Sequence, residues 1–418
     1  MSKNKPNRLT LWIFIGLFAG GLLGYLLHVS LPASLDGIVD PRLSNAIEGL
    51  SVVTDIFLRL IKMIIAPLVF STLVVGVAKL GDLSSVGRIG GKTMLWFITA
   101  SFISLFLGLV LVNLFEPGSA MNLELPPVNA ETGIDKASLT LKSFVTHIFP
   151  KSVIEAMANN EILQIVIFSL LFGAATAAIG ERGEPIIKAL DAVGHAMLKV
   201  TTFVMKLAPL AVFAAIAVMM AKSGPSIIGK YIIFISEFYL GLLLLWLILL
   251  GAGYALIKKR LFTLLHRLRD SIILAFSTTS SEAVFPKLLE ELERFGCKNR
   301  IVSFVLPLGY SFNLDGSMMY MTFASVFIAQ SYGIDMALGE QMLMLLTLMI
   351  TSKGIAGVPR ASLVVIAGTL SAFNIPEAGL LLLLGIDHIL DMGRSATNVI
   401  GNAVATVAVS KWEKSLDH

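Results

Sequence analysis

Long runs of apolar residues, separated by short polar segments, occupy most of this 418-residue chain. A helix needs about 20 such residues to cross the roughly 30 Å of hydrocarbon in a bilayer. Runs of that length lie near 9–31, 47–78, 92–115, 148–180, 196–222, 229–257, 299–330 and 376–410. The pattern therefore predicts an all-α polytopic membrane protein with eight transmembrane helices.

Two further apolar stretches, 262–296 and 334–373, are each interrupted near the middle by small and polar residues. Their arms, about 12–17 residues long, are too short to cross a bilayer. Non-helical backbone at membrane depth is tolerated only where protein or a water-filled cavity surrounds it. We therefore expect two re-entrant helical hairpins.

Each of these hairpins is followed by a long helix that we expect to be broken by polar residues. The breaks are predicted at 313–317 (NLDGS) and at 391–394 (DMGR). Counting crossings, the first unit starts in the cytoplasm and the second outside, so the pair forms inverted repeats. Inverted repeats whose unwound segments meet near the midplane are typical of secondary transporters. An ordinary loop explains either interruption alone, but two at matched positions favour a transporter.

Composition and charge agree with a membrane protein. Hydrophobic residues make up 56% of the chain, charged residues only 14%, and the mean hydropathy is +0.84, whereas soluble domains are about a quarter charged. Basic residues gather before the first apolar run, between the second and third, after the sixth and after the last. All four clusters fall on one side, which the positive-inside rule makes cytoplasmic. We expect both termini there and no nucleic-acid partner.

The last apolar run carries a polar stripe. Asp387, Asp391, Arg394, Asn398 and Asn402 follow one another at intervals of 4, 3, 4 and 4 residues. At about 100° per residue they fall within an arc of roughly 80° on one helix face. Ionisable residues at membrane depth are costly and usually functional. A buried ion-pair seam against another helix is the structural alternative.

Asp391 and Arg394 lie one helical turn apart and can neutralise each other in an empty site. The same two groups can bind the ammonium and a carboxylate of one zwitterion, because arginine presents a planar fork that matches carboxylate geometry. An intramembrane hydrolase needs a serine beside a basic residue, and the deep histidine, His388, lies off the stripe. We expect no enzymatic activity. The single cysteine, Cys297, excludes a cysteine-based metal site, and no cofactor is expected.

These motifs resemble the dicarboxylate/amino acid:cation symporter family, also called the glutamate transporter family. The resemblance covers nearly the whole chain in topology and is specific from about 271 to 412. It rests on the serine-rich first hairpin tip at 279–281, NLDGS at 313–317, GIAGVP at 354–359, and the motif from Asp387 to Asn398.

The resemblance implies a homotrimer that works as an elevator. A static scaffold, which also forms the trimer contacts, is expected at 9–80 and 148–222, and a mobile transport domain at 92–116 and 229–411. Compact loops without eukaryotic-style insertions favour a bacterial inner membrane. The implied partners are a small-molecule substrate, a coupling cation and the lipid bilayer.

The resemblance also assigns roles by position. Asp391 is expected to bind the substrate's α-ammonium and Arg394 its side-chain carboxylate. The second hairpin is expected to act as the extracellular gate, with Pro359 and Arg360 at its tip. The remaining substrate-binding residues are expected to be Ser280, Ser281, Ser317, Ser395, Asn398 and the backbone of Gly357 and Val358.

Substrate choice follows from the paired charges. A plain dicarboxylate lacks an ammonium and faces Asp391 as a like charge. A neutral amino acid leaves Arg394 unpaired in a desolvated site, at a cost of several kcal/mol. The predicted substrates are therefore L-glutamate, L-aspartate or both, and dicarboxylate symport is the alternative.

The coupling ion is predicted to be the proton. Sodium-driven relatives have a carboxylate at the position of Asn402 and oxygen-bearing side chains at those of Phe97 and Ala100, and phenylalanine and alanine offer no ligand to a hard cation. A partial site remains at Asn313 and Asp315, so sodium coupling is the alternative. The coupling group is expected to comprise Glu282, Asn313, Asp315, Asp387 and Asn402.

Glu282, Asp315 and Asp391 are the candidate proton carriers, because desolvation favours the neutral form of a buried carboxyl group. For Glu282 a second interpretation stays open, in which it is a fixed ion-pair partner of Arg360 that latches the two hairpins together.

Overall fold

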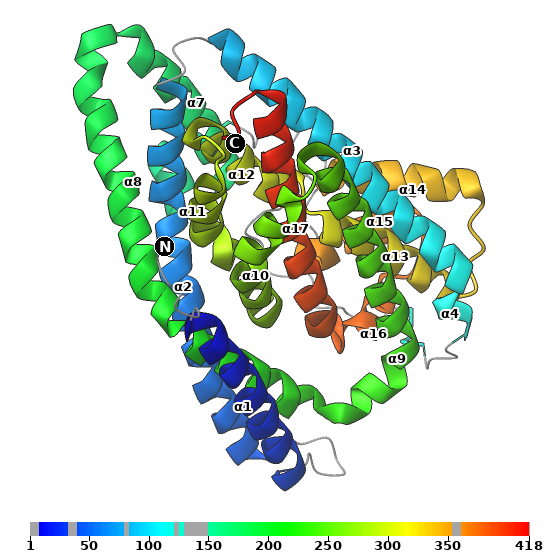
Figure 1. Ribbon diagram of the computed structural model, residues 1–418. Helices are drawn as coiled ribbons and strands as arrows, with labels where there is room; N and C mark the ends of the chain where they lie inside the picture. Colours follow the sequence, from blue (N-terminus) through cyan, green and yellow to red (C-terminus); the bar gives the residue numbers. More distant parts are fainter. Residues whose placement is uncertain are drawn as a thin grey trace.

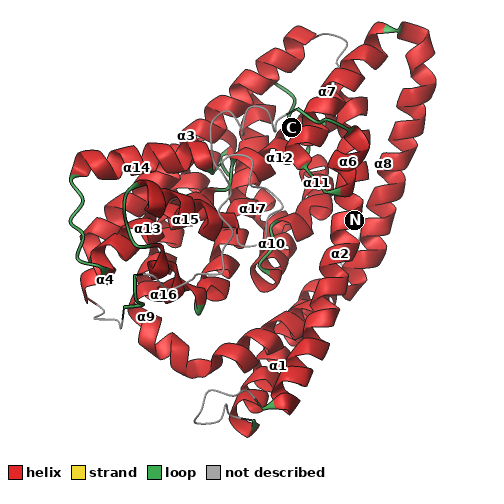
Figure 2. Ribbon diagram, turned by 180° about the vertical axis from the view of Figure 1, so that it is seen from behind, coloured by secondary structure: helices red, strands yellow, loops and turns green. Residues whose placement is uncertain are grey.

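The computed structural model describes residues 8–31, 40–78, 83–120, 125–128, 149–352 and 361–417. Within these residues every regular element is a helix, apart from one isolated β-bridge between Cys297 and Leu416, and Figure 2 shows no strand among them. The predicted all-α fold is confirmed.

Long helices dominate the first half of the chain. The elements there are α1 (Arg8–Ser30), α2 (Pro41–Ala78), α3 (Leu83–Phe115), α4 (Pro117–Ala120), α6 (Val153–Ala158), α7 (Ile162–Ala178), η1 (Gly180–Gly183), α8 (Glu184–Val204), η2 (Met205–Leu207) and α9 (Ala208–Ile257). Five stretches of the described residues are long and apolar enough to cross a bilayer: Leu11–Ser30, Pro41–Ala78, Gly87–Phe115, Gly180–Lys222 and Tyr231–Ile257. Eight crossings remain a prediction.

The predicted boundary between the spans 196–222 and 229–257 is wrong, because it falls inside helix α9. The sequence predicts separate spans at 196–222 and 229–257, but α9 runs unbroken through 50 residues. At 1.5 Å per residue it is about 75 Å long, and Figure 1 shows it curving from beside α1 toward α3 and α17. Hydropathy locates the polar interruption between the two runs, but it does not report whether backbone hydrogen bonds continue through that interruption.

Shorter helices fill the second half. They are α10 (Arg260–Thr278), η3 (Glu282–Val284), α11 (Phe285–Phe295), α12 (Asn299–Phe312), α13 (Asp315–Ser331), α14 (Leu338–Thr351), α15 (Ala361–Ala372), η4 (Glu377–Gly379), α16 (Leu380–Leu384) and α17 (Asp387–Trp412). The chain reverses between α10 and α11 through Thr279, whose φ of 52° is left-handed. A pair of short helices followed by an interrupted helix thus occurs twice in the element order.

Of the two predicted breaks, one is confirmed and one is wrong. The helix α12 ends at Phe312 and α13 begins at Asp315, so the NLDGS motif interrupts the helix as predicted. The segment 391–394 is continuous helix, and the second interruption lies at 385–386, between α16 and α17. The polar side chains at 391 and 394 pair with each other, so their polarity does not require an unwound backbone.

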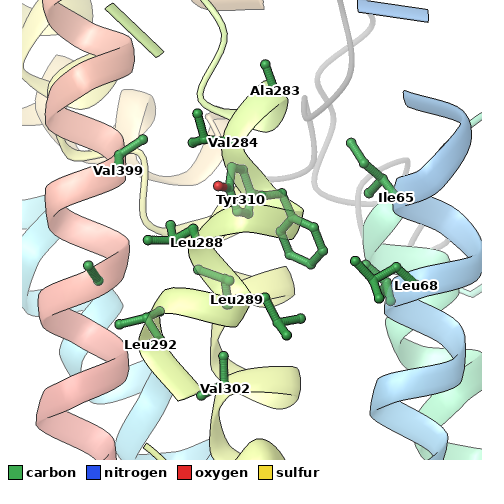
Figure 3. Packing of buried hydrophobic residues seen from close by; sticks show 14 of the residues in the cluster. Ile65, Leu68, Ala283, Val284, Leu288, Leu289, Leu292, Val302, Tyr310 and Val399 are labelled. Carbon is green, nitrogen blue, oxygen red and sulfur yellow. The ribbon is translucent and has the colours of Figure 1, made fainter. Parts of the chain in front are cut away.

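The hairpin of α10 and α11 lies deep in the protein. In Figure 3, α11 and α12 lie between α2 and α17, and Leu288, Leu289 and Leu292 of α11 fill the space. These leucines are fully buried, as are Leu68 of α2 and Val399 of α17. Burial of a leucine side chain contributes about 1.5–3 kcal/mol, so this layer fixes the hairpin against its neighbours.

The residues after α17 contact the first part of α3 and the start of α12. The Glu413 carboxylate accepts from Arg88 Nη2 at 3.1 Å and from Lys92 Nζ at 2.6 Å, both on α3. The backbone N–H of Lys298, just before α12, donates to the carbonyl of Ser415 at 3.1 Å. Burial alone raises the pKa of Glu413, but the hydrogen bonds from Arg88 and Lys92 outweigh burial and hold that pKa below its ordinary value.

Helix α1 lies against the first part of α9 through glycines. Because glycine has no Cβ, two helix backbones can approach closely where it occurs. Three glycines spaced four residues apart each face a backbone carbonyl of α9: Gly16 faces Pro209, Gly20 faces Phe213 and Gly24 faces Ala217.

We expect Gly20→Ala to loosen this contact, because the new Cβ collides with the Phe213 carbonyl oxygen. Overpacking of this kind costs about 1–3 kcal/mol, which for a chain of this length lowers the unfolding temperature by about 1–3 °C. Gly21→Ala is the matched control, since its Cβ meets only Ile216 Cγ2 at 3.9 Å. Thermal unfolding of both variants in detergent checks the prediction, and equal unfolding temperatures contradict it.

Candidate functional site

A buried arginine lies at the centre of the polar stripe on α17. Arg394 is 2% exposed, and its Nη2 lies 2.9 Å from Asp387 Oδ1 and 3.1 Å from Asp391 Oδ1. Separations of seven and three residues place both carboxylates on the same helix face as the guanidinium. The sequence placed Asp387 in the coupling group, and the structure places it beside Arg394.

Tyr320 of α13 completes this charge cluster. The Arg394 guanidinium carbon lies 4.0 Å from the centre of the Tyr320 ring, within the range of a cation–π interaction. The Tyr320 hydroxyl donates to Asp387 Oδ1 at 3.2 Å. Sequence reasoning missed this residue, although it lies one turn after Ser317 on the same face of α13. Tyr320 thus contacts both Arg394 and the carboxylate that pairs with it.

The cluster still has hydrogen-bonding capacity. Among the described residues, neither Nε nor Nη1 of Arg394 has a hydrogen-bond partner. The Asp391 side chain is 36% exposed, while that of Arg394 is 3% exposed. These two N–H groups lie on opposite edges of the guanidinium, so each can donate to a separate acceptor. The site therefore offers two further hydrogen-bond donors beside a partly exposed carboxylate.

Asn398 joins α17 to the start of α13. Its Oδ1 accepts from the backbone N–H of Gly316 at 2.9 Å and of Ser317 at 3.4 Å. Its Nδ2 donates to Ser317 Oγ at 3.2 Å. These N–H groups belong to the first turn of α13 and have no intrahelical partner, so Asn398 satisfies donors that the break exposes.

A second, fully buried polar cluster lies further along α17. Asn313 Nδ2 donates to Asp315 Oδ2 at 3.0 Å and to Asn402 Oδ1 at 3.3 Å. Ser104 Oγ of α3 donates to the carbonyl of Ala100 at 2.8 Å and also lies 3.3 Å from Asp315 Oδ1. Among the described residues, Asn313 Oδ1 and Asn402 Nδ2 have no hydrogen-bond partner. The structure thus brings together three of the predicted coupling residues and adds Ser104, which sequence reasoning missed.

The α3 positions next to this cluster are mostly apolar. Phe97 is 1% exposed and Ala100 is 6% exposed, and neither side chain carries an oxygen. Ser101 donates to the carbonyl of Phe312 at 3.2 Å. In the part of the chain that is described, no group of three or more histidine, cysteine, aspartate or glutamate residues has the arrangement of a metal site.

The first hairpin tip holds three of the predicted residues. Ser280 Oγ accepts from the backbone N–H of Ala283, the second residue of η3, at 3.2 Å. The carbonyl of Ser281 accepts from the Tyr310 hydroxyl at 3.0 Å, and Glu282 is half-buried at the start of η3. The side chain of Tyr310 on α12 therefore holds the tip through the backbone carbonyl of Ser281.

The remaining predicted residues divide into two groups. Ser395, next to Arg394 on α17, is buried. Gly357, Val358, Pro359 and Arg360 lie outside the described residues. The expected gate, and the expected contact between Glu282 and Arg360, are therefore still predictions.

Comparison with known proteins covers nearly the whole chain. The family model described as "Sodium:dicarboxylate symporter family" matches residues 9–412. The chain is 42% identical over 407 residues to the proton/sodium-glutamate symport protein of Geobacillus stearothermophilus, covering 96% of this chain and 93% of the relative. It is 40% identical over 423 residues to the proton/glutamate-aspartate symporter of Escherichia coli (strain K12), with coverage of 99% and 95%. A C4-dicarboxylate transport protein of Rhizobium etli is 41% identical over 382 residues, with coverage of 90% and 86%.

Proposed function

This chain belongs to the sodium:dicarboxylate symporter family, and from that premise we propose that it imports L-glutamate, L-aspartate or both together with protons. Membership makes the chain a multi-pass membrane transporter of a family of symporters, whose relatives carry acidic amino acids or dicarboxylates. The choice of amino acid over dicarboxylate, and of proton over sodium, is our proposal.

The observation that carries the proposal is the arrangement of Asp391 and Arg394. Nε and Nη1 of Arg394, which have no hydrogen-bond partner in the part of the chain that is described, offer donors to the side-chain carboxylate of an acidic amino acid. The Asp391 side chain, which is 36% exposed, suits its ammonium. Asn398 and Ser317, which hydrogen-bond to each other, supply polar groups for the α-carboxylate. One acidic amino acid can then contact groups of both signs in the site.

Charge accounting explains why a cation must accompany the substrate. Asp387, Asp391 and Arg394 together carry one net negative charge when all three are ionised, and an acidic amino acid adds a second. Two uncompensated negative charges in a desolvated site are very unfavourable. At least one proton or metal cation therefore has to bind with the substrate before it is carried across.

The residues at the buried cluster favour the proton. Asn402 offers an amide where a carboxylate would attract sodium, and the neighbouring Phe97 and Ala100 are buried and apolar. Hard cations require several oxygen ligands. Glu282, Asp315 and Asp391 are carboxylic acids that can bind a proton without needing such a shell.

Our proposal includes the mechanism that the resemblance implies. A mobile transport domain (92–116 and 229–411) moves as an elevator against the scaffold (9–80 and 148–222) within a homotrimer in a bacterial inner membrane. Both termini face the cytoplasm, and the second hairpin, with Gly357 to Arg360 at its tip, opens and closes the site from outside.

Uptake into proteoliposomes tests the function directly. Radiolabelled L-glutamate, L-aspartate and succinate are offered under an inward proton gradient without sodium, or under an inward sodium gradient at equal pH. We expect the two amino acids to accumulate under the proton gradient alone. Strict dependence on sodium would refute proton coupling, and accumulation of succinate in place of the amino acids would favour the dicarboxylate alternative.

Glu282→Gln is expected to uncouple uptake from the proton gradient, because glutamine keeps the shape of the side chain but cannot release a proton. The variant should still bind L-aspartate and exchange it across the membrane. It should no longer accumulate L-aspartate in response to the proton gradient. Glu290→Gln on α11 is the matched control, since Glu290 pairs with the exposed Arg294. Unchanged proton-driven accumulation in Glu282→Gln would exclude this residue as the carrier.

A further inference from the structure

One face of α9 makes direct contacts with the turn of α17 that holds Asp391 and Arg394. The Tyr239 hydroxyl donates to the carbonyl of Ile389 at 2.6 Å. Two turns further along, Trp246 Nε1 donates to Thr397 Oγ1 at 2.7 Å. The donors are separated by seven residues and the acceptors by eight, so two helix faces meet in register over two turns.

Between these hydrogen bonds the helices touch at a glycine. A Cβ on Gly393 would lie 2.5 Å from Leu242 Cδ1 and 3.1 Å from two ring carbons of Tyr239. The Tyr239 hydroxyl also faces the backbone of Gly393. A side chain at this position would require Leu242 and the Tyr239 ring to move, and the position lies between Met392 and the substrate-binding candidate Arg394.

The hydrogen bond from Trp246 extends into the backbone of α17. Thr397 Oγ1, which accepts from Trp246, donates in turn to the carbonyl of Gly393 at 2.8 Å. Tyr239 thus donates directly to the carbonyl of Ile389. Trp246 is connected through Thr397 to the carbonyl of Gly393. The turn of α17 between these two carbonyls contains Asp391.

We propose that Tyr239 and Trp246 are positioning residues that fix the rotation of α17, and so set how Asp391 and Arg394 are presented to the substrate. This inference rests on the proposed function, in which these two groups bind the two ends of an acidic amino acid. Aspartate and glutamate differ by one methylene between those ends. A binding pocket discriminates between ligands that differ by one methylene by about 10–200-fold, so a small rotation of α17 that moves these groups relative to their surroundings changes the preference between them.

Binding to the purified full-length protein tests this inference. Dissociation constants for L-glutamate and L-aspartate are measured by calorimetry for the wild type, Tyr239→Phe and Trp246→Phe. Unfolding temperatures are measured without substrate. We expect each variant to change the ratio of the two dissociation constants by at least about fivefold. Tyr332→Phe is the matched control, because its hydroxyl makes the same kind of bond, to the carbonyl of Pro126 at 3.0 Å, away from α17.

The outcomes separate a positioning role from a general loss of stability. A variant that only loosens the fold lowers the unfolding temperature and weakens both amino acids equally, and this result in both variants would overturn the inference. The inference would also be overturned if the wild type binds both amino acids and both variants show the same ratio of dissociation constants as the wild type. That result would leave the proposed function intact. A wild type that binds neither amino acid would refute the proposed function and this inference with it. Because the two variants act at separate hydrogen bonds, failure of one to fold leaves the other as the test.

Discussion

Replacing Arg394 with alanine is expected to reduce uptake of L-glutamate and L-aspartate by about 100-fold or more. The substitution removes the guanidinium N–H groups that have no partner among the described residues and that we propose as donors to the substrate carboxylate. It also leaves Asp387 without its partner at 2.9 Å. Removing one member of a buried ion pair costs about 3–5 kcal/mol, and each 1.4 kcal/mol corresponds to about tenfold in affinity.

Two further variants separate charge from geometry at this position. Arg394→Lys keeps the positive charge but loses the planar fork, so we expect an intermediate loss in substrate affinity. Arg294→Ala is the control, since Arg294 is exposed and pairs with Glu290 on the same helix. Uptake by Arg394→Ala within about threefold of the wild type, measured on protein of equal yield and unfolding temperature, would contradict the assigned role.

Replacing Asp391 with asparagine is expected to change the substrate preference. The ammonium of an amino acid loses its charged partner, and hydrogen bonds to charged groups contribute about 1.5–3 kcal/mol. The affinity for L-glutamate should fall by roughly 10–100-fold. A dicarboxylate such as succinate no longer meets a like charge, so its uptake relative to glutamate should rise.

Asp387→Asn provides the matched control for that switch. Asp387 is buried against Arg394 and Tyr320, and we assign it no contact with the ammonium. Its replacement should weaken amino acid and dicarboxylate uptake alike, because both depend on how Arg394 is held. Competition between radiolabelled glutamate and unlabelled succinate measures the ratio. An equal loss of both substrates in Asp391→Asn would refute the assignment of Asp391 to the ammonium.

These two carboxylates show how similar groups on one stripe receive different environments. Asp387 is 5% exposed and lies 2.9 Å from Arg394, whereas the Asp391 side chain is 36% exposed. Spacing along the helix cannot separate these environments, since both residues face the same side. The neighbouring helix decides, because the Tyr320 hydroxyl bonds to Asp387.

Several features follow from the sequence alone because their physical cause is local. The scarcity of charge over apolar runs requires a membrane and helices. The break at 313–314 follows from a cluster of polar and small residues inside an apolar run. The contact between Asp391 and Arg394 follows from their separation by one helical turn. In each case residues close in sequence contain the whole explanation.

Other features were decided only by the tertiary structure. The contact of Tyr239 with Ile389 joins residues 150 positions apart, and Ser104 meets Asp315 across 211 positions. Such pairs depend on how helices pack, which apolar patterning does not specify. The sequence also predicts interruptions in α9 and at 391–394 that the structure does not contain, because a helix persists wherever its backbone hydrogen bonds survive. Arg394 pairs with Asp387 and Asp391 within a continuous helix, whereas Asn313 pairs with Asn402 of α17 beside a true break. Polarity along the sequence does not distinguish these two cases.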